Sequence, residues 1–158
     1  MQYKTVRFGI VDVPTEQLII FPQGLPGFGE LREFFWVPVP ENSCFAWLQS
    51  ADLPEIAFLV TDPFLFRPQY EIHLSPAEQE LIKARQPEEV LVYVIVRIPA
   101  NGKTQDITAN FVAPVVVNTT SRLGCQVVLE GTNYQVREPL FKDIYTNPGC
   151  EGAAKCLF

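Results

Sequence analysis

The stretch that decides the fold is residues 58–68, F-L-V-T-D-P-F-L-F-R-P, in which Asp62 stands between two short apolar runs. A residue that precedes proline is pushed toward extended backbone. An aspartate in that place can also accept backbone N–H bonds from the following turn. The stretch therefore predicts a strand that ends at Thr61, a turn fixed by Asp62, and a new extended segment over 64–66.

The segment after this turn is apolar on both of its faces. In an extended chain Phe64 and Phe66 share one face and Leu65 takes the other. Such a segment is either buried on both sides, which the pattern favours, or it exposes an apolar patch to a partner. The same two interpretations apply to 34–36 and 45–48, which are also rich in aromatic residues.

Short apolar segments of this kind recur along the chain, separated by many of its 14 prolines. Several of them alternate with a period of two. In one, Tyr70, Ile72 and Leu74 fall on one face and His73 points to solvent on the other. The predicted strands are residues 5–10, 17–21, 34–39, 45–49, 57–61, 70–74, 90–98, 107–112, 115–117 and 126–129.

Local signals place the turns and one helix. Residues 25–28, L-P-G-F, have the type II turn pattern, and the pair 101–102, N-G, is typical of a hairpin turn. Ser75 and Glu78 form a capping box, with a proline at the first helical position. The helix should end near Arg85, because a proline follows two residues later.

These elements predict an all-β fold. We expect a small β-barrel-like domain, a pseudobarrel or sandwich, of about ten short strands with one short helix. A chain of 158 residues with 47% hydrophobic residues suits one domain with a substantial core. We expect residues 1–140 to form this domain and 141–158, which lack a clear pattern, to form a flexible C-terminal tail.

Charge and hydropathy exclude several classes of protein. The net charge is -6, and the 12 basic residues are scattered singly, so we expect no direct nucleic-acid binding. The longest apolar run, 90–96, is too short to span a bilayer. The chain starts without a segment of signal-peptide type, so we expect a cytoplasmic protein that does not contact a membrane.

The cysteines predict no metal site. They form no C-x-x-C pair, and the sequence has one histidine to accompany them. Free thiols in a reducing compartment are the favoured interpretation for all four, which are Cys44, Cys125, Cys150 and Cys156.

The sequence also lacks the signatures of an enzyme. No serine sits in a nucleophile elbow, and the glycines of 23–29 fit a turn better than a phosphate-binding loop. Asp62 and Asp106 would serve a hydrolase only if the fold brought them into one cleft. We expect no enzymatic activity, no catalytic residues and no cofactor or metal. An alternative is a ligand-binding β-barrel whose aromatic interior holds a small apolar molecule.

Four stretches of the sequence, taken in order, resemble the motifs of a known family. They are F-P-Q-G-L-P-G-F at 21–28, F-A-W-L-Q-S at 45–50, F-L-V-T-D-P-F at 58–64 and T-A-N-F-V-A-P-V-V-V-N at 108–118. With them the chain resembles the flagellar assembly factor FliW family, from about residue 3 to 140. Each motif is weak alone, and the four in order are specific.

This resemblance implies a cytoplasmic, non-enzymatic β-barrel-like protein with two protein partners. Family members bind flagellin and the translational regulator CsrA, and they antagonise CsrA repression of flagellin synthesis by partner switching. When flagellin accumulates it occupies the factor, and the freed CsrA represses flagellin mRNA. Differential affinity alone can drive such an exchange.

The partner surface is expected where apolar residues flank the turn at Asp62, with acidic support nearby. The predicted protein-binding residues are Leu48, Gln49, Asp62, Phe64, Phe66 and Glu71.

Overall fold

The chain is built from short strands, as the computed structural model shows for residues 1–141 and the backbone of 156–157. The strands are β1 (Gln2–Thr5), β2 (Gly9–Asp12), β3 (Ile19–Ile20), β4 (Glu33–Pro38), β5 (Phe45–Ser50), β6 (Ala57–Thr61), β7 (Ile72–His73), β8 (Val90–Arg97), β9 (Thr108–Ala109), β10 (Val115–Asn118), β11 (Gly124–Gln126), β12 (Glu138–Pro139) and β13 (Cys156–Leu157). The helices are α1 (Pro76–Leu81) and the 3₁₀ turns η1 (Thr15–Gln17), η2 (Pro63–Leu65), η3 (Pro87–Glu89) and η4 (Thr104–Asp106).

Nine strands form one curled antiparallel sheet. Its path runs β11-β10-β8-β6-β5-β4-β3, and β9 and β12 continue from β8. The two ends of the path meet at a single isolated bridge between Ile20 and Leu123. The sheet is therefore barrel-like, as predicted, but one bridge replaces the ladder that would close it.

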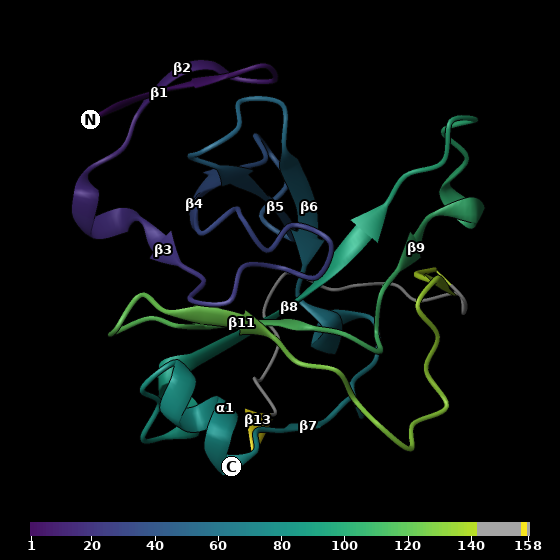
Figure 1. Cartoon of the computed structure of the whole chain (residues 1–158). Helices are drawn as coiled ribbons and strands as arrows, with labels where there is room; N and C mark the ends of the chain where they lie inside the picture. Colours follow the sequence, from purple (N-terminus) through teal and green to yellow (C-terminus); the bar gives the residue numbers. More distant parts are fainter. Residues whose placement is uncertain (142–155, 158) are drawn as a thin grey trace.

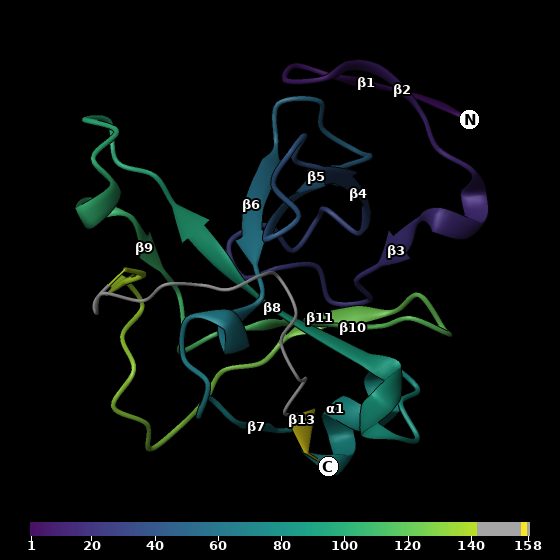
Figure 2. The same ribbon diagram turned by 180° about the vertical axis from the view of Figure 1, so that it is seen from behind.

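The central strand β8 pairs with three other strands of the sheet. Its first half pairs with β10, and its second half pairs first with β6 and then with β9. The C-terminal half of β8 and the strand β9 project together as an arm. Helix α1 lies on the opposite side of the molecule (Figure 1). The β1–β2 hairpin lies beside β4, β5 and β6, as both views show (Figure 2).

Apolar side chains fill both faces of the curled sheet. The largest buried cluster surrounds Phe66, Tyr70 and Phe111, and a second surrounds Phe34 and Leu48. A third, smaller cluster lies beneath the N-terminal hairpin. None of the helices within residues 1–141 is long and apolar enough to cross a bilayer.

The prediction of one strand over 5–10 is wrong, because the chain turns back within it. The hydroxyl of Thr5 accepts from Phe8 N and donates to Gly9 O, both at 2.8 Å. Gly9 has a φ of +70°, which glycine adopts readily. The hydroxyl and the glycine together convert the apolar run into the hairpin turn between β1 and β2.

The prediction of an extended segment over 64–66 is also wrong. Asp62 O accepts from Leu65 N at 3.3 Å and Pro63 O accepts from Phe66 N at 3.1 Å, which makes η2 a 3₁₀ turn. Proline presets the φ angle that such a turn needs. Phe64, Leu65 and Phe66 all point into the core, so burial, the favoured interpretation, is confirmed.

The predicted type II turn and helix cap are confirmed, whereas the helix and one strand are shorter than predicted. Phe28 N donates to Leu25 O at 2.7 Å, and Gly27 has the positive φ of a type II turn. Both hydrogen bonds of the Ser75–Glu78 capping box are present, although α1 ends four residues earlier than predicted. The strand predicted over 107–112 shrinks to β9, because Asn110 accepts from two backbone N–H groups and bends the chain.

The domain boundary and the flexible tail stay predictions, and the structure tests two of the four expected free thiols. Residues 142–155 and 158, including Cys150, lie outside the described residues, while β13 pairs in parallel with β7. Cys44 is disulfide-bonded, so the prediction of a free thiol there is wrong. Pairing depends on spatial proximity, which spacing along the sequence does not supply. Cys125 is a free, buried thiol, as predicted.

Candidate protein-binding surface

Two of the predicted binding residues, Leu48 and Gln49, are fully buried on β5. Leu48 packs in the cluster around Phe34. The Gln49 Nε2 lies within 3.4 Å of four backbone carbonyls, those of Ser50, Leu53, Pro54 and Ile56. Gln49 therefore fixes the β5–β6 loop from inside.

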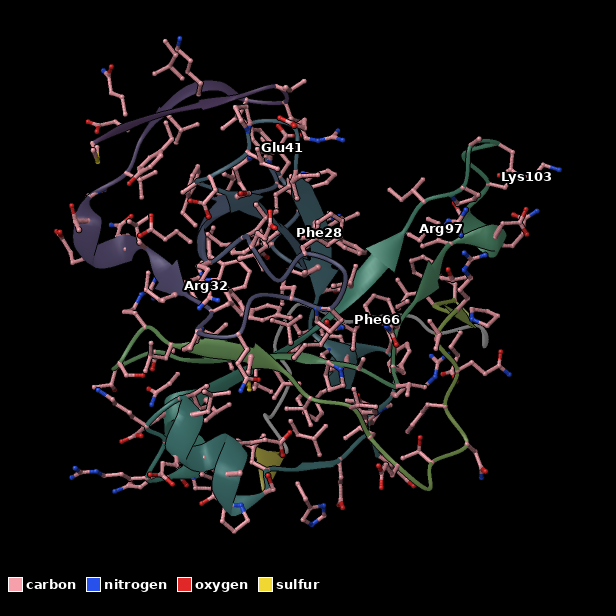
Figure 3. All side chains as sticks on the ribbon, in the orientation of Figure 1. Phe28, Arg32, Glu41, Phe66, Arg97 and Lys103 are labelled. Atoms are coloured by element: carbon pink, nitrogen blue, oxygen red, sulfur yellow. The ribbon has the colours of Figure 1, made fainter. Side chains whose placement is uncertain are left out.

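Phe64 and Phe66 are also buried, at 5% and 6% exposure. Phe64 packs against Tyr70, with ring centroids 5.8 Å apart. Phe66 lies centrally in the molecule (Figure 3) and contacts the rings of Phe45 and Phe141. Both rings therefore pack mainly in the core, and Phe64 also forms part of the wall of a hollow at Asp62.

Asp62 and Glu71 are the predicted residues with accessible side chains. Glu71 is exposed, just before β7, whereas Asp62 is half-buried at the end of β6. The accessible part of the predicted surface therefore consists mainly of its two acidic residues. The binding role of the whole set stays a prediction.

The turn at Asp62 holds its carboxylate in a defined position. Oδ1 accepts from Phe64 N at 2.9 Å, which confirms the predicted Asx-turn. Burial raises the pKa of Asp62 above its usual 3.8, and the hydrogen bond from Phe64 N opposes part of this rise. Burial, together with the charge of Asp62, also raises the pKa of Tyr93. The phenol is therefore neutral beside the carboxylate at neutral pH.

A hollow opens over this carboxylate. We call it the Asp62 hollow; its volume is about 200 Å³. Its walls are mostly apolar or aromatic, and its lining residues are Ser43, Cys44, Phe45, Ala46, Asp62, Phe64, Leu65, Leu91, Val92 and Tyr93.

A second depression, the apolar groove, adjoins the Asp62 hollow at Phe45, which lines both. It has a volume of about 370 Å³, and its lining includes residues of β5 and β6 and of the arm formed by β8 and β9. It is lined by Val39, Asn42, Phe45, Trp47, Leu59, Val96, Ile98, Thr104, Ile107 and Phe141.

The N-terminal hairpin covers part of one groove residue, Trp47. The guanidinium carbon of Arg7 lies 4.2 Å from the centroid of the Trp47 ring, and Phe8 packs edge-on against the same ring. A cation over an indole face is a favourable contact. The hairpin therefore holds the ring of Trp47 in place.

The carboxylates of the hydrolase hypothesis are not brought into one hollow. Asp106 ends η4, is exposed and accepts from Asn101 Nδ2 at 3.0 Å, and it does not line the Asp62 hollow. Among residues 1–141, no group of three or more His, Cys, Asp or Glu could hold a metal ion.

Sequence reasoning missed most of the residues that line these depressions, among them Phe45, Leu91 and Tyr93. A signal was present for two of them, because Leu91 and Tyr93 are two apart on a strand and so share a face. Their proximity to Asp62 comes from the pairing of β6 with β8, which places Thr61 opposite Val94.

The fold and these depressions define an all-β domain on an incompletely closed antiparallel barrel, with one acidic hollow beside an apolar groove. The family model described as FliW protein matches residues 2–140, and the chain belongs to this family. The resemblance found in the sequence is thereby confirmed.

Relatives in several bacteria support this membership. A protein named flagellar assembly factor FliW from Moorella thermoacetica is 47% identical over 147 residues, 93% of this chain and 92% of the relative. One of the same name from Bdellovibrio bacteriovorus is 41% identical, over 89% of this chain and 79% of its own. A crystal structure of the flagellar assembly factor FliW superposes with a TM-score of 0.81 at 34% identity, over 89% of this chain and 97% of that one.

Proposed function

We propose that this chain is a cytoplasmic flagellar assembly factor that binds flagellin and the translational regulator CsrA. It antagonises CsrA repression of flagellin synthesis by partner switching. The observation that carries the proposal is family membership over residues 2–140, together with a relative named flagellar assembly factor FliW at 47% identity.

The exchange needs no chemistry beyond binding. CsrA bound to this protein does not repress flagellin mRNA, and flagellin that accumulates displaces CsrA from it. A ligand shifts such an equilibrium only by its difference in affinity for the two states. The coupling is reciprocal, so CsrA must weaken flagellin binding by the same factor.

Two physical features support a role in binding proteins. The net charge of -6 favours encounter with a basic partner, and a protein that holds RNA presents basic residues. The surface also offers an apolar groove beside an acidic hollow, and a protein segment can fill both.

Calorimetry tests the proposal directly. The purified protein is titrated with flagellin and, separately, with CsrA, both from the same organism. We expect saturable binding to each, and release of CsrA when flagellin is added to the CsrA complex. Binding to flagellin alone would reduce the function to that of a chaperone, and binding to neither by a folded sample would refute the proposal.

A second candidate function is the binding of a small apolar molecule. The apolar groove favours it, since its 370 Å³ falls within the range of about 300–1,000 Å³ usual for ligand sites. Trp47 lines this groove, so a ligand there would change its fluorescence. A saturable change on adding a neutral apolar dye, abolished in Trp47→Phe, would support this function; unsaturable binding would exclude it.

A further inference from the structure

We propose that Phe45 divides a two-part docking site for a basic and apolar protein segment. A lysine or arginine of the partner enters the Asp62 hollow, and an apolar side chain next to it enters the apolar groove. This inference rests on the proposed function and adds to it the place and the chemistry of recognition.

Charge is the first argument. Asp62 is the one charged residue in the lining of either depression. The two ion pairs among the described residues join the Met1 amino group to Asp12 and Arg67 to Glu138, so Asp62 has no cationic partner in this part of the chain. Its Oδ1 accepts from Phe64 N, while Oδ2 has no hydrogen bond from any described residue. One carboxylate oxygen therefore remains for a donor from outside.

Desolvation is the second argument. Burial without a cation raises the pKa of Asp62, which means that the surroundings disfavour its charged form. A cation that reaches it would reverse this effect. Because the site is partly shielded from water, the pair would be stronger than an ordinary surface ion pair.

The shape of the lining is the third argument. Apart from Asp62, the walls of the hollow are largely aliphatic or aromatic, with Phe45, Leu91 and Tyr93 among them. Lysine and arginine have the complementary form, since an apolar stem carries a charged head. Two of the lining residues, Phe45 and Tyr93, are aromatic, and a cation packs favourably against an aromatic ring.

The shared residue sets the spacing of the partner segment. Since Phe45 lines both depressions, the two side chains that fill them must lie close together on the partner. In an extended segment, residues two apart point to the same side and lie about 7 Å from each other. The site therefore fits a segment of the form basic-x-apolar, or its reverse.

The first test removes the charge and keeps the turn. Asp62→Asn retains an oxygen that can accept from Phe64 N, and Glu80→Gln removes one exposed negative charge on α1, outside both depressions, as a control. CsrA and flagellin are titrated into each variant at low and at high salt. We expect Asp62→Asn to weaken at least one partner by about tenfold or more and to reduce the salt dependence of its binding. Glu80→Gln should stay within about twofold.

The second test places a competing cation of this chain in the Asp62 hollow. Leu91 lines it and is 38% exposed, so Leu91→Lys can place a competing ammonium group near Asp62 at little cost to folding. Leu53→Lys is the matched control, since Leu53 is 39% exposed and lines neither depression. We expect Leu91→Lys to weaken the same partner as Asp62→Asn, and Leu53→Lys to bind as the parent does.

The third test addresses the groove. Ile98→Asp puts a charge at a groove residue that is 53% exposed, and Val128→Asp does the same at a site 62% exposed outside both depressions. We expect Ile98→Asp to weaken the same partner again, with unchanged thermal melts for both variants.

The outcomes separate the two proposals. If the parent protein binds neither partner, the proposed function fails and the docking site fails with it. If the parent binds and either Asp62→Asn or Leu91→Lys binds both partners as tightly as the parent, the docking site alone is refuted. If only Ile98→Asp has no effect, the apolar half of the site is refuted.

Discussion

The Nε atom of Arg67 donates to Oε2 of Glu138 at 2.9 Å, across 71 residues of sequence. Both side chains are largely buried, at 15% and 5% exposure. The remaining donors of the same guanidinium reach the carbonyls of Phe66, Pro139 and Leu140. Arg67 thus links β12 to the segment that carries Phe66, and the ring of Phe66 packs against that of Phe45.

Replacement of Arg67 should be among the most destabilising changes on the chain. Arg67→Met leaves the buried carboxylate of Glu138 without its cation, and we expect a loss of about 3–5 kcal/mol in the free energy of unfolding. Glu138→Gln should cost less, because the guanidinium keeps its three carbonyl acceptors. Urea denaturation measures both. A loss of under about 1 kcal/mol for Arg67→Met, typical of a surface pair, would contradict this role.

The charge of Asp62 should reduce stability at neutral pH. Its pKa is higher in the folded state than the usual 3.8, so the folded protein binds more protons in the interval between the two values. Stability from this group therefore rises as pH falls through the folded-state pKa and levels off below the unfolded one. We expect Asp62→Asn to melt higher than the parent at pH 7, since asparagine keeps an acceptor for Phe64 N.

The pH dependence is the control for this prediction. The difference in melting temperature between parent and Asp62→Asn should shrink as the pH is lowered toward 3.8. A parent protein that is more stable than Asp62→Asn at pH 7 would mean that the carboxylate already has a compensating cation.

Gly24 and Gly27 lie in the same loop and should respond differently to alanine. Both have positive φ angles, +66° and +83°, which cost an alanine about 1–2 kcal/mol. A Cβ at Gly24 would also lie 2.6 Å from the Cα of Gly29, whereas one at Gly27 meets nothing within 4 Å. Gly24→Ala should therefore lose about 1–3 kcal/mol more than Gly27→Ala in chemical denaturation. Equal losses would disprove the close approach of Gly24 to Gly29.

Cys125 should be unreactive in the native protein. It is 5% exposed, and burial, with a smaller effect from the charge of Glu78, raises its pKa to about 12. The thiolate is the reactive form, so a disulfide reagent at pH 8 should not modify it. The count of titrated thiols should be the same for the parent and Cys125→Ser when native and should differ by one in urea. A difference of one in the native state would show that Cys125 is accessible.

The features that the sequence predicted well are those fixed within a few residues. Asp62 before a proline, Ser75 with Glu78, and Gly27 after a proline each satisfy their own backbone neighbours, so their geometry does not depend on the rest of the chain. Strands β5 and β6 were also predicted closely, because each is a short, nearly continuous apolar run.

The candidate site was harder to predict because it depends on contacts across the sheet. Leu48 and Phe66 lie beside the surface in sequence but beneath it in space, and apolar residues in a core or in an interface look alike in a sequence. Tyr93 reaches Asp62 only through the pairing of β8 with β6. The hairpin turn within 5–10 was missed because a threonine hydroxyl, rather than a standard turn pair, forms it.

The central claim is that flagellin and CsrA exchange on this protein, and one measurement of RNA binding tests it. A fluorescent RNA from the flagellin mRNA leader is bound to CsrA, and its anisotropy is followed while this protein and then flagellin are added. We expect the anisotropy to fall as this protein takes CsrA from the RNA and to rise again as flagellin returns CsrA to it. An anisotropy that does not fall, or that falls and does not recover with flagellin in excess, would contradict partner switching.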